Sequence, residues 1–237
     1  MTYTHGHAEP VLRSHRWRTA DNSAAYLLPH LRDGQAVLDV GCGPATITAD
    51  IARRFPASTV LGIDPAREVL EGVTEALPNL TVQVGDILAG DLPPDRFDVV
   101  HAHQILQHLS DPVEALRQMA RVCRPGGIIA VRDADYGAMT WAPAMPDMDR
   151  WLKAYRSAHR DNGSEPDAGR HLLGWAHEAG LSDVTPSASA WCFATPEDRS
   201  WWAGLWADRV TAPESLLSRQ LVARGHTPAD LRRIATS

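Results

Sequence analysis

The chain has 237 residues, a formal net charge of -6 at pH 7 and three widely spaced cysteines, Cys42, Cys123 and Cys192. This length suits one domain with a sizeable core, and an acidic chain without a cluster of Lys and Arg argues against nucleic acid or an anionic membrane as the main partner. Scattered cysteines and no long apolar run argue against a disulfide framework, a zinc site and a membrane span. We therefore expect a cytoplasmic protein, monomeric or homodimeric, that acts on a small molecule and needs no metal.

Strands and helices alternate along the first two thirds of the sequence. Short apolar runs rich in Val and Ile predict buried parallel strands, and stretches with helical spacing of apolar residues lie between them. In chain order we expect a helix at Ala20 to Leu31, a strand at Ala36 to Val40, a helix at Thr46 to Phe55, a strand at Thr59 to Ile63, a helix at Arg67 to Leu77, strands at Leu80 to Val84 and Phe97 to Ala102, a helix at Pro112 to Cys123 and a strand at Gly127 to Arg132. This repetition predicts an α/β fold whose parallel sheet is covered by helices on both faces.

The last third of the chain is mainly helical in pattern. The expected elements are helices at Met145 to Asn162 and Asp167 to Gly180, a strand at Ser189 to Phe193, and helices from Pro196 onward. Thr227 and Pro228 are typical of a helix start, and the chain ends soon afterwards at Ser237. We therefore expect the natural protein to continue beyond this residue.

A glycine turn gives the first chemical signal. The stretch Val-Leu-Asp-Val-Gly-Cys-Gly-Pro-Ala, residues 37 to 45, is a strand that leads through Gly41 and Gly43 into a helix. Glycines simply make tight turns, but their missing side chains also let a ligand approach backbone N–H groups at the start of a helix. The next strand ends at Asp64, where a carboxylate can accept both hydroxyls of a ribose. Together the two features predict a nucleotide-like ligand.

The same features would fit a dinucleotide, so other residues must discriminate. A dinucleotide site favours a third small residue where Thr46 stands, and it usually serves a chain with a separate substrate domain. Neither feature is evident. Asp39, just before the turn, suits the amino group of a methionine moiety, which a pyrophosphate would not require. The pattern therefore favours a sulfonium cofactor over a nicotinamide dinucleotide.

Several further motifs resemble those of class I S-adenosylmethionine-dependent methyltransferases, closest to the UbiE-like group (the methyltransferase domain 11 type). The matching stretches are Val37 to Ala45, Leu61 to Pro65, Val84 to Ile87, Phe97 to Val100 and Arg124 to Gly127. The resemblance covers roughly residues 36–133 and implies a Rossmann-like three-layer α/β/α sandwich with a mostly parallel seven-stranded sheet and a helical substrate cap. It implies a single domain with an N-terminal helical lid at 1–35, a cofactor-binding core at 36–133, and the remaining strands with a Trp-rich cap at 134–237.

The resemblance also implies which residues hold S-adenosylmethionine and its product S-adenosylhomocysteine. Asp39, Gly41 and Gly43 would line the methionine part, Asp64 would hold the ribose hydroxyls, and Asp86 would accept from the adenine amino group. The further residues expected at the cofactor are Cys42, Pro65, Gly85, Ile87, Ala102 and His103. We expect the Cys42 backbone to contribute contacts while its thiol stays a bystander.

The reaction centre is predicted at the end of the fourth strand. His103 stands where relatives that methylate amino groups carry the first residue of an Asn-Pro-Pro-Tyr motif, and a histidine can act as a base because its pKa lies near neutrality; the alternative is a purely structural role. Asp135 and the N-terminal His5 and His7 are further candidate bases, and Tyr136 is a candidate acceptor contact. A base is optional, because methyl transfer from a sulfonium mainly needs alignment and exclusion of water.

An arginine and several tryptophans complete the prediction. Arg18 can pair with the cofactor carboxylate, the alternative being a solvated helix entry. Seven of the eight tryptophans follow the fifth predicted strand, where they can wall an aromatic or extended apolar acceptor such as a specialised metabolite. We expect Trp141, Trp201 and Trp202 to contact it.

Two other functional classes stay open at this point. A non-catalytic nucleotide-binding protein would bind the cofactor without turnover, and a nicotinamide-dependent oxidoreductase would bind NAD instead. The sequence leaves undecided whether carbon, nitrogen or oxygen is methylated.

Overall fold

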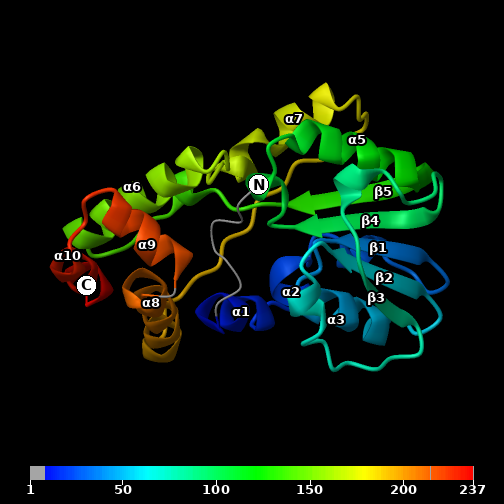
Figure 1. Ribbon diagram of the computed structural model, residues 1–237. Helices are drawn as coiled ribbons and strands as arrows, with labels where there is room; N and C mark the ends of the chain where they lie inside the picture. The colour runs from blue at the N-terminus through cyan, green and yellow to red at the C-terminus, as the bar shows by residue number, and fades with distance from the viewer. Residues whose placement is uncertain (1–8, 214, 237) are drawn as a thin grey trace.

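The computed structural model describes residues 9–213 and 215–236. Its centre is a five-stranded sheet in the order β3-β2-β1-β4-β5, with every neighbouring pair parallel. The strands are β1 (Ala36–Val40), β2 (Thr59–Asp64), β3 (Leu80–Val84), β4 (Phe97–His103) and β5 (Cys123–Arg132). The chain moves outward in one direction from β1 to β3 and then returns to place β4 on the other side of β1, so the order of the strands reverses between β1 and β4 (Figure 1).

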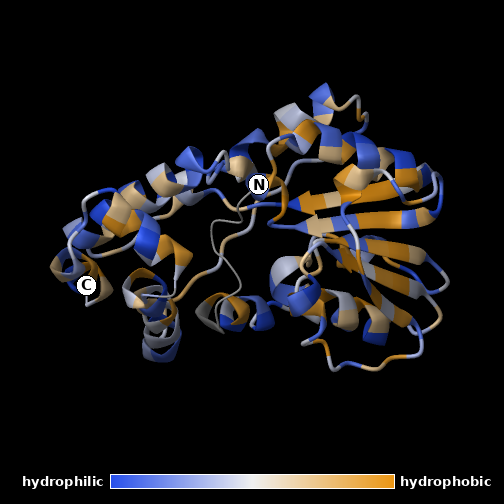
Figure 2. Cartoon of the chain, in the orientation of Figure 1, coloured by the Kyte–Doolittle hydropathy of each residue, from blue (hydrophilic) through white to orange (hydrophobic). Residues whose placement is uncertain are grey.

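The side chains of each strand point alternately to the two faces of the sheet, and a hydrophobic core lies on each face. Val37 and Val99 pack with α2 (Ala20–Ser23) and α3 (Thr46–Arg54), whereas Leu38 and Val100 pack with α5 (Pro112–Val122). Helix α7 (Leu172–Glu178) lies on the same side as α5. Successive side chains of a strand point to opposite faces, so the mostly apolar central strands β1 and β4 (Figure 2), whose residues are nearly all buried, are covered on both faces. The three-layer α/β/α arrangement is thereby confirmed.

A helical cap stands at the carboxyl-terminal end of the sheet (Figure 1). It consists of α6 (Pro146–Asp161), α8 (Pro196–Thr211), α9 (Leu216–Ala223) and α10 (Pro228–Ala235), which share an aromatic core of their own. Helix α1 (Glu9–Arg16) lies against α8, and Arg13 pairs with Asp208 at 2.6 Å. The remaining helix, α4, is Arg67–Leu70, and 3-10 turns occur at Leu28–His30, Ile87–Ala89, Leu106–His108, Tyr136–Ala138 and Ala168–His171.

Side-chain caps explain where several of these helices begin. Asp111 accepts a hydrogen bond from the Glu114 N–H, and Pro112 occupies the first turn of α5. Thr195 and Thr227 form capping boxes with the residues three positions later, and a proline follows each of them. Such caps satisfy N–H groups that the helix itself leaves unpaired. None of the described helices is both long and apolar enough to cross a membrane.

The number of strands and one strand assignment were wrong. The described residues form five strands rather than seven, and Ser189 to Phe193 is not a strand. In this segment Trp191 and Phe193 both pack against Trp17 of the N-terminal segment, at ring-centroid distances of 5.2 and 5.8 Å. The alternating apolar pattern therefore serves packing between side chains and not pairing within the sheet.

Two helices are shorter than the periodicity predicted. The helix expected at Arg67 to Leu77 ends at Leu70, where Gly72 and a β-branched Val73 follow and both disfavour helix. The helix expected at Ala20 to Leu31 is broken into α2 and a 3-10 turn that begins at Leu28. Pro29 stands inside the second piece, where it cannot continue an α-helix.

Candidate active site

A cavity of about 380 Å³ lies at the carboxyl ends of β1 to β4, beside the point where the strand order reverses. Open α/β sheets bind their ligands at this place. The predicted cofactor residues that line it are Arg18, Asp39, Gly41, Cys42, Gly43, Asp64, Pro65, Gly85, Asp86, Ile87 and His103. Ala102 is the exception, because it is fully buried in the core between β4 and α5. The structure therefore brings together most of a set that was assembled from five separate stretches of sequence.

The glycine turn has the backbone that a close ligand approach requires. Gly41 and Gly43 have φ values of +66° and +54°, a region that side chains disfavour. A Cβ on Gly41 would lie 2.1 Å from the Ile105 Cδ1 atom, so the Ile105 side chain would have to move to admit one. The N–H groups of Gly41 and Cys42 both donate to the Ile63 carbonyl, at 2.7 and 3.0 Å. The turn is thus fixed to β2 and shaped as a cradle.

Asp64 is held at the end of β2 by two backbone N–H groups. Its Oδ2 accepts from Gly43 at 3.0 Å and its Oδ1 accepts from Ala66 at 2.9 Å. Asp64 lines the cavity, where a carboxylate can accept the hydroxyls of a ribose. The residue predicted to bind the ribose is therefore connected directly to the residue predicted to line the methionine part.

Asp39 is buried, with only 3% of its surface exposed. Its Oδ1 lies 2.8 Å from His101 Nδ1 on β4, and its Oδ2 accepts from the Thr48 hydroxyl on α3 at 2.6 Å. These bonds fix the end of β1 to both of its neighbours. They also show that His101 is structural, as a partner of Asp39. The predicted contact of Asp39 with an ammonium group would use the lone pairs that these two bonds leave.

Asp86 and Ile87 lie where β3 opens into the cavity. Asp86 caps the 3-10 turn at Ile87–Ala89 by accepting from the Leu88 N–H at 2.9 Å. The side chain of Asp86 is exposed and that of Ile87 is buried. This pair presents a carboxylate and an apolar surface side by side, which suits the amino edge and the flat face of an adenine.

His103 ends β4 and lines the cavity with 5% of its surface exposed. Neither of its ring nitrogens has a hydrogen-bond partner among the described residues. Burial lowers the pKa of His103 well below its usual range, and the positive charge of Arg18 lowers it further. The ring is therefore neutral near pH 7.

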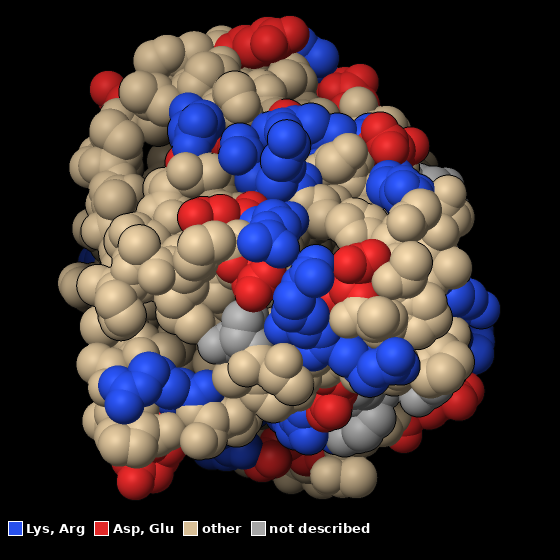
Figure 3. Space-filling view, turned by 90° about the vertical axis from the view of Figure 1, so that its left-hand side faces the viewer, with Lys and Arg blue, Asp and Glu red and all other residues tan. Residues whose placement is uncertain are grey.

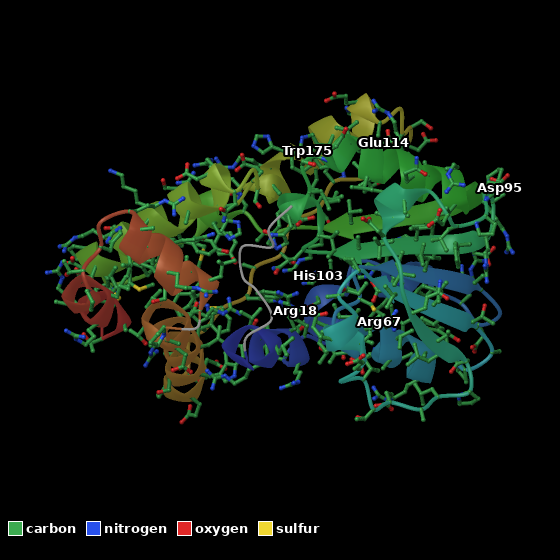
Figure 4. All side chains as sticks on the ribbon, in the orientation of Figure 1. Arg18, Arg67, Asp95, His103, Glu114 and Trp175 are labelled. Atoms are coloured by element: carbon green, nitrogen blue, oxygen red, sulfur yellow. The ribbon has the colours of Figure 1, made fainter. Side chains whose placement is uncertain are left out.

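The residue after His103 is strained. Gln104 has a φ of +56°, which a residue with a side chain adopts at a cost of about 1 kcal/mol. Its Oε1 accepts from Arg18 Nη2 at 2.6 Å. Backbone strain of this kind is concentrated at functional sites. Figure 4 shows Arg18 and His103 in the middle of the molecule, between the cap and the ends of the strands.

Of the other residues predicted to act in the site, some line the cavity and others do not. Tyr136 lines the cavity, whereas Asp135 is engaged with Arg170 in an ion pair at 2.7 Å and is not part of the lining. Trp141, Trp201 and Trp202 are also outside the lining. Trp201 packs on Trp17 at 5.1 Å and Trp202 on Trp151 at 5.7 Å, so this pair belongs to the aromatic packing of the cap and lid. His5 and His7 fall outside the described residues.

Sequence reasoning missed several residues of the lining. His15 and His108 are two of them, and Ile105 and Leu109 supply apolar surface beside them. Arg209 of α8 is the most distant in sequence, and no motif pointed to it. His15 stands three positions before Arg18, and His108 lies in the 3-10 turn that follows β4.

The Cys42 thiol has no sign of reactivity. Burial raises its pKa above the ordinary value, and the carboxylates of Asp39 and Asp64 raise it further. A thiol of this kind stays protonated and is a poor nucleophile. The described residues contain no group of His, Cys, Asp and Glu side chains arranged for a metal ion.

Comparisons with known proteins decide the family. Residues 31–180 match the family described as a methyltransferase domain. An uncharacterized methyltransferase of Schizosaccharomyces pombe is 35% identical over 223 residues, which are 89% of this chain and 80% of that protein. The chain belongs to the class I S-adenosylmethionine-dependent methyltransferases. This methyltransferase is also 36% identical over 124 residues to the trans-aconitate 2-methyltransferase of Deinococcus radiodurans, covering 50% of this chain and 46% of that protein.

Solved structures agree on the fold. The phosphoethanolamine N-methyltransferase 2 of Haemonchus contortus, in complex with S-adenosyl-L-methionine, has a TM-score of 0.56 at 18% identity and covers 90% of this chain and 46% of that chain. The YcgJ protein of Bacillus subtilis has a TM-score of 0.51 at 20% identity and covers 67% and 68% of the two chains. The family excludes the oxidoreductase alternative, whereas the narrower UbiE-like assignment stays a prediction.

Proposed function

We propose that this methyltransferase transfers the methyl group of S-adenosylmethionine to a small-molecule acceptor. The observation that carries the proposal is the cavity at the reversal of the strand order, where the glycine cradle, Asp64 and Asp86 line one continuous wall. The left-handed backbone of Gly41 and the place of His103 in the lining fit a ligand in this cavity. When bound, the cofactor supplies an electrophilic methyl group on a good leaving group.

The protein's contribution is to position the reactants and to exclude water. Asp64 and the glycine turn fix one end of the cofactor, and Arg18 holds its carboxylate. The cap closes the other side of the cavity through Tyr136 and Arg209. Alignment of this kind can supply a large part of the acceleration. For an acceptor that must lose a proton, His103 is the proposed recipient, because its neutral ring lines the cavity; its lowered pKa makes it a weak base, so it would assist by accepting a hydrogen bond from the acceptor.

The acceptor is an aromatic or largely apolar metabolite. Support comes from Ile105, Leu109 and Tyr136, which line the cavity, and from Tyr155, whose ring lies 4.5 Å from that of Tyr136. Several relatives carry names that refer to trans-aconitate, a small molecule. Basic and acidic side chains both occur on the face of the cap that Figure 3 shows; we propose no nucleic-acid partner because the chain as a whole is acidic, with a formal net charge of -6.

Titration calorimetry with S-adenosylhomocysteine tests the proposal. The wild-type chain should bind in the micromolar range, about -8 kcal/mol, and should not bind NAD. Asp64→Ala should weaken binding by about 1.5 to 3 kcal/mol, the range for lost hydrogen bonds to a charged group. Asp91→Ala removes an exposed carboxylate outside the cavity and should bind as the wild type does.

A second variant separates the ribose contact from the role of Asp64 in the turn. Asp64→Asn keeps one oxygen acceptor for the neighbouring N–H groups and loses the charge, so its fold should survive, as measured by the thermal unfolding midpoint. Unchanged affinity in both Asp64 variants would refute the ribose assignment. Binding of S-adenosylhomocysteine without turnover on any of a panel of aromatic acceptors would favour the non-catalytic alternative.

A further inference from the structure

The cavity is divided into an acidic side and a basic side. Asp39, Asp64 and Asp86 stand at the ends of β1, β2 and β3. The lid and the cap contribute Arg18 and Arg209 instead. No Asp or Glu is among the lining residues that come from the lid, from the cap or from the segment after β4, within the described part of the chain. A ligand that spans the cavity therefore meets opposite potentials at its two ends.

Arg209 is an unusual residue for such a place, because its side chain is long and charged but only 5% of its surface is exposed. Its guanidinium lies 4.7 Å above the ring of Trp206 and donates to the Ser14 hydroxyl at 2.5 Å. The Ser215 hydroxyl donates to its backbone carbonyl at 2.6 Å. An arginine stays protonated when it is buried, so α8 presents a fixed positive charge to the cavity.

The position of Arg209 assigns it to the acceptor side. The Trp206 ring that supports its guanidinium also lies 6.4 Å from Tyr136, edge to face. Arg209 and Tyr136, which both line the cavity, are thus connected through Trp206, and they belong to the cap and to the segment after β5. The ends of β1, β2 and β3 form the cofactor wall on the opposite side of the cavity. The carboxylate of the cofactor already has Arg18 as its predicted partner.

We propose that the methyl acceptor carries a carboxylate group and that Arg209 binds this group, an inference that rests on the proposed function. A guanidinium matches a carboxylate with two parallel hydrogen bonds. Among the described residues Arg209 is the arginine of the lining that lies on the acceptor side, and one guanidinium forms a bidentate pair with one planar carboxylate, which favours a carboxylate over a phosphate dianion. The apolar part of the acceptor would then lie along Tyr136, Ile105 and Leu109, toward His103 and the methyl group.

The test uses a matched pair of probes on the protein saturated with S-adenosylhomocysteine. Benzoate and benzamide have nearly the same shape, but only benzoate carries a charge, and phenyl phosphate carries a different anion. We expect calorimetry to show benzoate binding about tenfold or more tightly than benzamide, and phenyl phosphate binding more weakly than benzoate. Equal binding of benzoate and benzamide, no binding of benzoate in the millimolar range, or a preference for phenyl phosphate would overturn the inference.

Variants assign the preference to Arg209. Arg209→Gln should bring the ratio of the two affinities close to one and leave the affinity for S-adenosylhomocysteine unchanged, whereas Arg219→Gln, on the exposed side of α9, should keep the wild-type ratio. Arg209→Lys retains a charge and serves if Arg209→Gln does not fold. A ratio that survives both Arg209 substitutions contradicts the assignment. Loss of S-adenosylhomocysteine binding by the wild type would instead contradict the proposed function, so the two failures are distinguishable.

Discussion

Asp133 is the strongest candidate for a buried group that makes stability depend on pH. It follows β5, and its Oδ1 accepts from the Gln107 N–H at 3.1 Å, beneath the turn that forms the wall after β4. Its Oδ2 is shielded from solvent and has no hydrogen-bond partner among the described residues. Burial raises the pKa of this carboxyl from 3.8 to about 7, although the backbone N–H groups of Gln107 and Leu106 oppose the shift.

The sign follows from which state holds the proton more tightly. The folded state binds the Asp133 proton more tightly than the unfolded state does. Asp133 therefore costs no stability below about pH 4, and it lowers the free energy of unfolding as the pH rises from there to about 7. A rise of about three pKa units corresponds to about 4 kcal/mol in total. About 2.5 kcal/mol of this loss falls between about pH 5 and about pH 8.

Asp133→Asn removes the titration and keeps an oxygen acceptor for Gln107. We expect urea unfolding to show that the free energy of unfolding of the variant, minus that of the wild type, grows by about 2 to 3 kcal/mol between about pH 5 and about pH 8. Buried histidines such as His159, whose pKa burial lowers to about 3, contribute the opposite slope, but equally in both proteins. Asp91→Asn, at an exposed carboxylate, should show no such growth. A constant difference for Asp133→Asn across this range would refute the reasoning.

Two further predictions concern the cavity. Gly41→Ala should lower the affinity for S-adenosylhomocysteine by about tenfold or more, because it places a Cβ against Ile105 at a φ of +66°. Gly174→Ala, in open space on α7, is the control. Equal affinity in both variants would contradict the role of the glycine turn as a cradle. An NMR titration should show the His103 ring still neutral at the pH where an ordinary histidine is half protonated, its signal being assigned by its loss in His103→Asn. Titration near the ordinary value of 6.5 would show that the ring is not buried as described.

The sheet and the cofactor wall could be predicted from the sequence because their signals are local. Each buried strand is a short apolar run, and the ligand-facing residues come directly after it. The carboxyl ends of parallel strands meet at one edge of the sheet, so Gly41, Asp64, Asp86 and His103 had to come together once the strands were recognised. The family confirms the chemistry that this set of residues predicted.

The acceptor wall could not be predicted, because it depends on how separate helices pack. Arg209 lies in the middle of a helix, and nothing in the neighbouring sequence distinguishes it from an exposed arginine. Its burial results from Trp206 on its own helix and from Ser14, which is 195 positions away. The prediction of a strand at Ser189 to Phe193 was wrong for a related reason. An alternating pattern indicates which side chains face a core, but it does not indicate whether the backbone pairs with a strand.

The tryptophans of the cap show how stability and recognition are connected there. A small helical unit has little interior, so it needs large side chains to bury enough apolar surface, and Trp151, Trp202 and Trp206 pack together with Tyr155 for this purpose. Their role in recognition is therefore indirect. Trp206 supports Arg209 on one side and Tyr136 on the other, so the aromatic core of the cap determines where a charged and a phenolic side chain meet the acceptor.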